Sequence, residues 1–380
     1  AYKTIYTSQL LEFSWMNDML PYQIALTLIK DIGAVHAKNL IDYFGDAKSV
    51  LLAQKNELAQ VDGIGEIRAN SILSFNDFAA VEVEIEFIEK HKIQPIFIGS
   101  TAYPVRLLHC YDSPTLLYYK GAAELNTQRV ISVVGSRKHT EYGKKITEQL
   151  IAALPNKNTL IVSGLALGID AIAHKSAIEN SLPTIGVLAH GLDTIYPPQH
   201  RNLAKEILQT GGLLTEFRKN TITDKYNFPK RNRIVAGMAD ATIVIETEVK
   251  GGSMITANLA ADYHREVFAL PGKITDTKSA GCLQLIQQNK AIVFSGIEHF
   301  IETMQWDEAP INAIKEKSVS IEFTATENSI IKLLEMHTTL SIDALVHQST
   351  HSGSSISEAL LNLEFQNIIT ALPGKSYALY

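Results

Sequence analysis

The segment VISVVGSR, residues 130–137, decides the fold that we expect for this chain. Its first five residues, four of them β-branched, predict a buried strand. The glycine that follows predicts a tight turn into a helix over residues 140–154. The same order recurs in residues 160–174, where LIV precedes the loop SGLALGID and another helix. Repeated strand, loop and helix units indicate a parallel, doubly wound sheet.

The pattern extends in both directions from this segment. On its N-terminal side, a charged amphipathic helix over residues 81–92 leads into short strands at 96–98 and within 112–121. On its C-terminal side, further strands are predicted at residues 184–188, 213–216, 241–246, 267–270 and, as an edge strand, 291–294. We therefore expect an α/β domain with a mostly parallel sheet over residues 81–306.

The N-terminal part, residues 1–80, is predicted to be helical. Residues 31–38 and 58–69 each place a short glycine turn between two helices, which resembles tandem helix-hairpin-helix units of a SAM-like domain. Such a turn lets backbone N–H groups approach a DNA phosphate. Lys38 and Arg68 are the few cations near these turns, so internal packing is favoured over DNA contact.

The C-terminal part is predicted to be a winged-helix domain of residues 321–380, joined by a polar linker at 307–320. Its pattern is three short helices followed by a two-stranded wing. Two basic and six acidic residues give this segment a net charge of −4. The third predicted helix, residues 355–363, carries Glu358 and no cation, whereas duplex readers bring Lys or Arg to phosphates. We predict protein contacts for this domain, not duplex binding.

Composition sets the broad class of the protein. The chain has 380 residues, 46% of them hydrophobic, which fits two or three domains with substantial cores. Its net charge of −6 confines any nucleic-acid contact to a local patch. Two cysteines are too few for a disulfide framework. The sequence shows no apolar run of membrane-spanning length and no signal-peptide pattern, so we expect a soluble cytoplasmic protein.

The strongest local charge lies in residues 218–233, with six basic residues against one acid. Within it, residues 228–237 read FPKRNRIVAG. Tyr226 and Phe228 alternate with the cations, an arrangement that suits base stacking beside phosphate contacts. A solvated basic loop leading into a helix is the alternative interpretation for this run taken alone.

Three loops at predicted strand ends share a glycine and serine composition. They are residues 135–137, residues 163–168 and residues 251–253. Glycines let backbone amides approach an anion, and helix N-termini favour negative charge. None is a Walker loop or a GxGxxG fingerprint, so no nucleotide cofactor is expected. The three loops beside the basic segment predict a phosphate-binding crevice.

The sequence supports a catalytic site less well than it supports phosphate binding. Asp170 and His174 stand four residues apart on one predicted helix, which could pair an acid with a base. Asp170 lies near the helix start, however, where capping or a favourable dipole interaction is the commoner role. No His, Cys, Asp and Glu cluster has metal-ligand spacing, so neither a metal nor catalytic residues are predicted.

Taken in order, these motifs resemble those of the DNA-processing protein A family (DprA, also called Smf). The matching segments are residues 103–104, 135–137, 163–174, 191–197, 228–237, 252–256 and 271–272. The resemblance implies an extended Rossmann-like domain that binds single-stranded DNA, usually as a homodimer. It also implies a recombination mediator that loads RecA on incoming strands in natural transformation, without a cofactor and without turnover.

The resemblance assigns roles to single positions. The DNA-binding candidates are Gly135, Ser136, Arg137, Gly164, Lys230, Arg231, Arg233, Gly252 and Ser253, with Lys175 as a further cation. Structural or loop-shaping roles are expected for Ser163, Asp170, His174, Asn232 and Thr256. After residues 196–197 the family often has a basic residue, whereas here Arg201 is the nearest cation.

Two other functions stay open at this stage. The first is a nucleotide or nucleoside-phosphate hydrolase of the lysine-decarboxylase-like Rossmann group, which has similar loops. The segment GGSMIT, residues 251–256, lacks that group's preceding proline and following glutamate. The second is a structural protein that only binds partners, which the acidic C-terminal domain permits but which leaves the basic segment unexplained.

Overall fold

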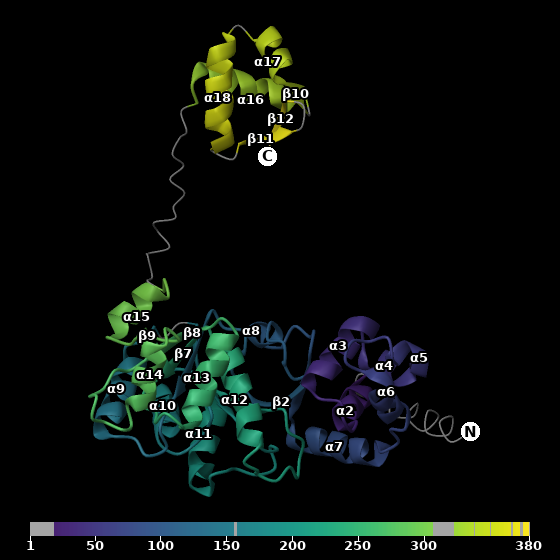
Figure 1. Cartoon of the computed structure of the whole chain (residues 1–380), viewed down its shortest axis with the longest axis vertical. Coiled ribbons are helices and arrows are strands. Elements are labelled where there is room, and N and C mark those ends of the chain that lie inside the picture. Colours follow the sequence, from purple (N-terminus) through teal and green to yellow (C-terminus); the bar gives the residue numbers. More distant parts are fainter. Residues whose placement is uncertain are drawn as a thin grey trace. The chain divides into compact units, whose positions relative to one another are not determined.

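The computed structural model describes residues 19–155, 158–306, 323–337, 339–349, 351–365, 368–372 and 375–379 (Figure 1). The chain divides into two units, one ending at Gln305 and the other beginning at Trp306. Each unit has its own hydrophobic core. The linker predicted at residues 307–320 lies outside the described residues.

A nine-stranded sheet organises the first unit, with the order β1-β2-β6-β5-β4-β3-β7-β8-β9. The strands from β6 to β9 are all parallel, and β2 and β1 extend the sheet in antiparallel pairings. The α/β prediction is therefore confirmed. Their bounds are β1 Gln94–Phe97, β2 Leu116–Gly121, β3 Arg129–Val134, β4 Thr159–Ser163, β5 Thr184–Val187, β6 Gly212–Thr215, β7 Ala241–Val244, β8 Glu266–Ala269 and β9 Ile292–Val293.

The strand order reverses between β3 and β7. From β3 the chain adds β4, β5 and β6 on one side and later places β7, β8 and β9 on the other. Val134 at the end of β3 pairs with Val244 at the end of β7, so the two following loops leave the sheet at the same edge. In open parallel sheets ligands bind in the crevice at such a switch point.

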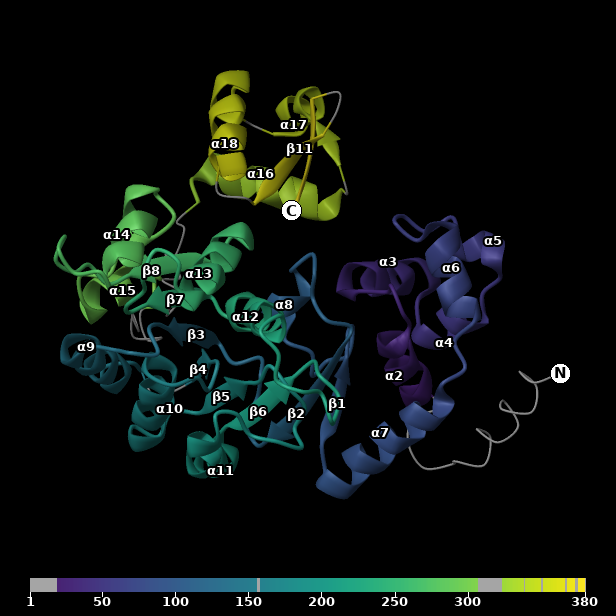
Figure 2. The same cartoon turned by 60° about the horizontal axis from the view of Figure 1, so that its bottom comes forward.

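Helices cover both faces of the sheet. Figure 2 shows α9, α10 and α11 on one side and α12 and α13 on the other. Because both faces are covered, β3 to β7 are buried at every position. The helix bounds are α8 Val105–Leu108, α9 Glu141–Ala152, α10 Ile169–Glu179, α11 Arg201–Thr210, α12 Asn227–Gly237, α13 Gly252–Asp262, α14 Ala280–Gln287 and α15 Ile297–Thr303.

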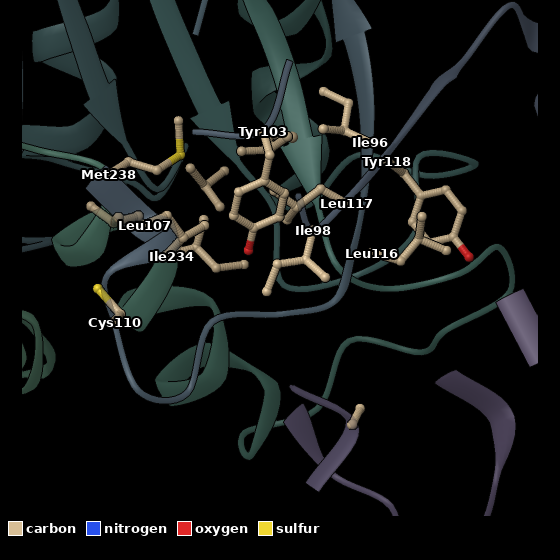
Figure 3. Packing of buried hydrophobic residues seen from close by; sticks show 14 of the residues in the cluster. Ile96, Ile98, Tyr103, Leu107, Cys110, Leu116, Leu117, Tyr118, Ile234 and Met238 are labelled. Atoms are coloured by element: carbon tan, nitrogen blue, oxygen red, sulfur yellow. The ribbon is translucent and has the colours of Figure 1, made fainter. Parts of the chain in front are cut away.

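The basic segment at residues 228–237 is helical throughout, so the basic loop of the alternative interpretation is not present at these residues. Helix α12 begins at Asn227 and already contains Pro229 and Asn232. Pro229 is in the first turn, where a backbone N–H has no partner inside the helix, so a proline is tolerated there. The inner face of α12 is anchored in the core, where Ile234 and Met238 lie beside Leu107 (Figure 3).

The N-terminal helices form the two predicted hairpins, and their cations are used internally. Lys38 Nζ donates to the carbonyl oxygens of Leu108 at 3.0 Å and Cys110 at 2.9 Å. Arg68 donates to the carbonyl oxygens of Asp31 and Gly63. One continuous core joins these helices to the sheet. Their bounds are α2 Leu20–Leu28, α3 Ala34–Phe44, α4 Ala47–Leu52, α5 Lys55–Leu58, α6 Gly65–Leu73 and α7 Phe78–His91.

The second unit has the winged-helix arrangement that the sequence predicts, with three helices and a small antiparallel sheet in the order β10-β12-β11. Strand β10 has only two residues and was not predicted. Among the residues described above, no helix combines the length and apolar character needed to cross a membrane. The bounds are α16 Ala325–Met336, β10 Leu340–Ser341, α17 Ile342–Gln348, α18 Gly353–Phe365, β11 Ile369–Leu372 and β12 Ser376–Leu379.

The charge of the second unit leads to a direct prediction. Helix α18, the third helix of the unit, carries Glu358 and Glu364 and no cation. We expect an isolated segment of residues 321–380 to show no duplex binding at moderate salt, because its two basic residues against six acidic ones are too few to displace counterions from phosphates. Fluorescence anisotropy with a labelled duplex measures this. Saturable duplex binding by the segment would contradict the prediction.

Candidate functional site

A pocket of about 520 Å³, here called the switch-point pocket, lies where the strand order reverses. It is bounded by the loops after β3, β4 and β7, by the segment leading into α12, by α12 itself and by the first turns of α13. Its lining residues are Val134, Gly135, Ser136, Arg137, Gly164, Ala166, Asp170, Lys225, Phe228, Pro229, Arg231, Asn232, Val235, Thr247, Glu248, Gly251, Gly252, Ser253, Ile255 and Thr256.

Two of the loop glycines are packed too closely against neighbouring atoms to leave room for a side chain. Gly168 has a φ of +82°, and a Cβ there would lie 2.2 Å from the carbonyl oxygen of Ser136. At Gly135 a Cβ would lie 2.7 Å from the Ile169 side chain. Gly252, by contrast, is exposed, and a Cβ there would meet no atom within 4 Å. Tight packing therefore explains the first two glycines, and only Gly252 leaves room for a ligand.

Arg231 ties α12 to the ends of two strands. The residue is 5% exposed, and its Nη1 donates to the carbonyl oxygens of Gly164, just after β4, and of Val187, at the end of β5. Gly164 has to be a glycine here because a Cβ would lie 2.5 Å from the guanidinium. Burial lowers the pKa of Arg231 to about 10, so the group is still protonated at neutral pH.

Asp170 closes the loop between β4 and α10. Its Oδ2 accepts hydrogen bonds from the N–H groups of Gly164 at 3.1 Å and Ala166 at 3.3 Å. Burial raises the pKa of this carboxyl group, and the nearby charge of Arg231 opposes that rise. The Asp170 carboxylate and the Arg231 guanidinium therefore both hold the loop between β4 and α10 in place.

His174 does not form an acid–base pair with Asp170. Its Nδ1 is 2.7 Å from Thr184 Oγ1, and burial lowers its pKa to about 3, so the imidazole is neutral. Ser163 donates its hydroxyl to the carbonyl oxygen of Val133 at 2.6 Å. Among the described residues, no group of three or more His, Cys, Asp or Glu side chains could hold a metal ion.

The structure brings most of the predicted site residues together but separates three cations from them. Lys175 lines a different hollow on α10 with Lys144 and Glu148. Lys230 and Arg233 line a groove on the other side of α12. Arg233 is buried and paired with Glu216. The predicted residues that line the switch-point pocket are Gly135, Ser136, Arg137, Gly164, Asp170, Arg231, Asn232, Gly252, Ser253 and Thr256.

Two residues with side chains suited to a ligand, Lys225 and Tyr196, were absent from the predicted set, and Phe228 was named only for base stacking. Lys225 and Phe228 line the switch-point pocket, and Tyr196 lines a smaller recess that shares Arg137 and Phe228 with it. The Arg137 guanidinium lies 5.3 Å from the centroid of the Phe228 ring, and the Tyr196 and Phe228 centroids are 6.2 Å apart. The position of Lys225 three residues before Phe228 was the signal that could have identified Lys225.

The electrostatics of the pocket favour an anion with planar groups. Arg137 and Lys225 are exposed, and α13 begins at the pocket without a side-chain cap on its first amides. Cations next to aromatic faces suit phosphates alternating with bases. Two carboxylates also line the pocket: Asp170, which the loop amides hold, and the exposed Glu248.

A doubly wound sheet with its site at the switch point places the protein in the Rossmann-like class. The family model of DNA recombination-mediator protein A matches residues 94–305, and the model of the DprA winged helix domain matches residues 316–375. The chain therefore belongs to the DprA/Smf family of DNA recombination mediators, which confirms the resemblance seen in its sequence motifs.

Relatives share most of the chain. Protein Smf of Escherichia coli is 32% identical over 324 residues, covering 83% of this chain and 85% of that protein. The X-ray structure of DNA processing protein A from Streptococcus pneumoniae superposes with a TM-score of 0.65 at 31% identity, covering 74% of this chain and 97% of that one. A structure of DNA processing protein A from Helicobacter pylori, described by its single-stranded DNA binding mode, superposes with a TM-score of 0.52 at 32% identity. The match covers 57% of this chain and 97% of that one.

Proposed function

We propose that this protein binds single-stranded DNA in the switch-point pocket and acts as a recombination mediator without catalytic turnover. The observation that carries the proposal is the Arg137 guanidinium over the Phe228 ring, in a pocket that Lys225 also lines, at the edge where three glycine loops meet. Family membership and the reported binding mode of the Helicobacter pylori relative support it.

Each part of the pocket has a role in this proposal. Arg137 presents a planar guanidinium that can hold a phosphate through two hydrogen bonds, and Lys225 adds a second exposed charge. The first amides of α13, next to the unobstructed Gly252, donate hydrogen bonds to another phosphate. Bases stack on Phe228 and Tyr196. Arg231 positions the loops and does not contact the strand directly.

Single strands are favoured over duplex because stacking on a ring requires a base that has left its own stack. The cations of the pocket are confined to one edge of a chain whose net charge is −6, so a long rigid duplex would meet few of them. The hydrolase alternative is less well supported because residues 251–256 lack the proline and the glutamate of that group's motif, and Asp170 is held by the amides of Gly164 and Ala166.

Family resemblance extends the proposal to partners. We infer a homodimer in the cytoplasm that delivers RecA to single strands taken up during natural transformation. The measurement that tests this part is RecA filament assembly on DNA already coated with a single-strand binding protein, with and without this chain. Faster assembly supports the mediator role, and an unchanged rate contradicts it.

Binding to oligothymidylate is expected to be at least about tenfold tighter than binding to a duplex of the same length. Phe228→Ala should weaken single-strand binding by about 1 to 3 kcal/mol, the range for loss of one base–aromatic stack. Phe228→Tyr is the matched control because it keeps the ring, and it should bind nearly as the parent does. Fluorescence anisotropy at several salt concentrations measures the binding of the parent protein, Phe228→Ala and Phe228→Tyr. Equal affinity for single strand and duplex would refute the proposal.

A further inference from the structure

A second groove, here called the hairpin groove, lies between the first helical hairpin and α12. It has a volume of about 670 Å³, within the range of roughly 300–1,000 Å³ seen for ligand pockets. Pro229 and Ile255 line both this groove and the switch-point pocket, so the two hollows meet at these residues. Figure 2 shows α3 on the side of the helical region that faces α8 and α12.

The hairpin groove combines an apolar wall with features that attract an anion. Phe217 and the 41% exposed Ile255 supply apolar surface. The N-terminus of α3 opens into the groove with no side-chain cap, and Ala37 is the first residue whose N–H bonds back to Gly33. Lys230, an exposed lysine on α12, lies on the opposite wall.

A buried arginine gives a second, independent sign of a ligand. Arg233 lines the groove, is more than nine-tenths buried, and has an Nη1 with no hydrogen-bond partner among the described residues. Its other contact is the ion pair with Glu216. Two acids also line the groove: Glu216, which pairs with Arg233 and has an Oε1 with no hydrogen-bond partner among the described residues, and Asp112, which accepts a hydrogen bond from the Tyr263 hydroxyl at 2.6 Å.

We propose that a single strand bound in the switch-point pocket continues across Pro229 and Ile255 into the hairpin groove. There a phosphate lies at the N-terminus of α3 near Lys230, and the adjoining base packs on Phe217. The first helical hairpin is thus a DNA-contacting element whose target is the same strand and not a duplex. This inference rests on the proposed function of the switch-point pocket.

The test compares oligothymidylates of about 6 and about 20 nucleotides, one near the lower end and one beyond the upper end of the ~4–16-nucleotide sites of single-strand grooves. Gly33→Asp places a carboxylate at the start of α3, and Asp is a favourable N-cap. It therefore keeps the helix while repelling a phosphate. Gly33→Ala is its control, because a Cβ at this position meets no atom within 4 Å. Lys230→Glu has its control in Lys205→Glu, an exposed lysine on α11 outside both hollows.

We expect Gly33→Asp and Lys230→Glu to weaken binding of the long strand about tenfold and to lower its salt slope by about 0.7 for each phosphate that is no longer neutralised. Binding of the short strand should stay within about twofold, and both control variants should bind as the parent does. Hydrogen exchange of the amides of residues 34–36 should slow with the long strand and not with the short one.

The outcomes separate this inference from the proposed function. If the parent protein fails to bind even the short strand, the proposed function itself is wrong. If the short strand binds but neither variant changes the affinity for the long strand, the strand does not enter the hairpin groove and the inference is overturned. Equal loss for both strands would also overturn it, because Lys230 and Gly33 would then belong to the first binding site.

Discussion

Replacing Arg231 with methionine is expected to lower the free energy of unfolding by about 3 to 5 kcal/mol, the loss typical when one member of a buried charged group is removed. The guanidinium donates to the carbonyl oxygens of Gly164 and Val187 from a buried position. Methionine fills much of the same volume but leaves both carbonyls without this donor. It also removes the charge that most strongly opposes the raised pKa of Asp170.

Urea unfolding followed by circular dichroism measures this loss. Lys225→Met is the matched control, since it removes an exposed cation from the same pocket and should change stability by no more than about 0.5 kcal/mol. Adding Asp170→Asn to Arg231→Met should restore part of the stability, because it removes the uncompensated carboxylate. A loss below about 1 kcal/mol for Arg231→Met would show that this guanidinium does not hold the loops together.

Arg137→Ala is expected to weaken single-strand binding by about tenfold and to reduce the salt slope by about 0.7 for each phosphate that Arg137 neutralises. Tenfold corresponds to about 1.4 kcal/mol, close to the lower limit for a hydrogen bond to a charged group. The side chain is exposed and stacks on Phe228, so its removal should leave the unfolding midpoint unchanged. Removal of Arg137 is therefore expected to lower the affinity for DNA without lowering stability, whereas removal of Arg231 is expected to lower stability.

The measurement is a salt titration of binding to a labelled oligothymidylate. Arg137→Lys should keep the salt slope but lose affinity, because an ammonium group cannot hold a phosphate through two parallel hydrogen bonds. Lys205→Ala removes an exposed cation on α11 and should have no effect. Unchanged affinity and slope in Arg137→Ala would remove the main support for DNA binding in the switch-point pocket.

Much of the fold could be predicted because the central strands are buried on both faces. Residues 160–162 form a continuous apolar run and residues 130–134 one interrupted only by Ser132, which is the pattern of parallel strands covered by helices. The two-residue β10 could not be predicted, since a bridge that short has no periodicity. Its place depends on pairing with β12, a contact across more than thirty residues of chain.

The site was harder to predict because helix phase decides which cations are exposed. Lys230 and Arg231 are neighbours in sequence, yet one is exposed and the other is buried. Their difference follows only once α12 is known to start at Asn227, and the expectation of a basic loop concealed that start. Arg233 looked like a phosphate ligand, but its partner Glu216 is seventeen residues away and the pairing cannot be read from spacing.

The continuous core of the first unit has a consequence for biosynthesis. Helices α2 to α7 leave the ribosome before any strand of the sheet, yet their apolar residues share one cluster with β2, α12 and α13. Lys38 donates hydrogen bonds to the carbonyl oxygens of Leu108 and Cys110, which are synthesised after these helices. The apolar residues of the nascent hairpins therefore stay partly exposed until the ribosome has added about 170 residues after the end of α7, which brings the chain to the end of α13. During that interval the chain exposes apolar surface that the folded protein buries, so we expect chaperones to bind its first 91 residues.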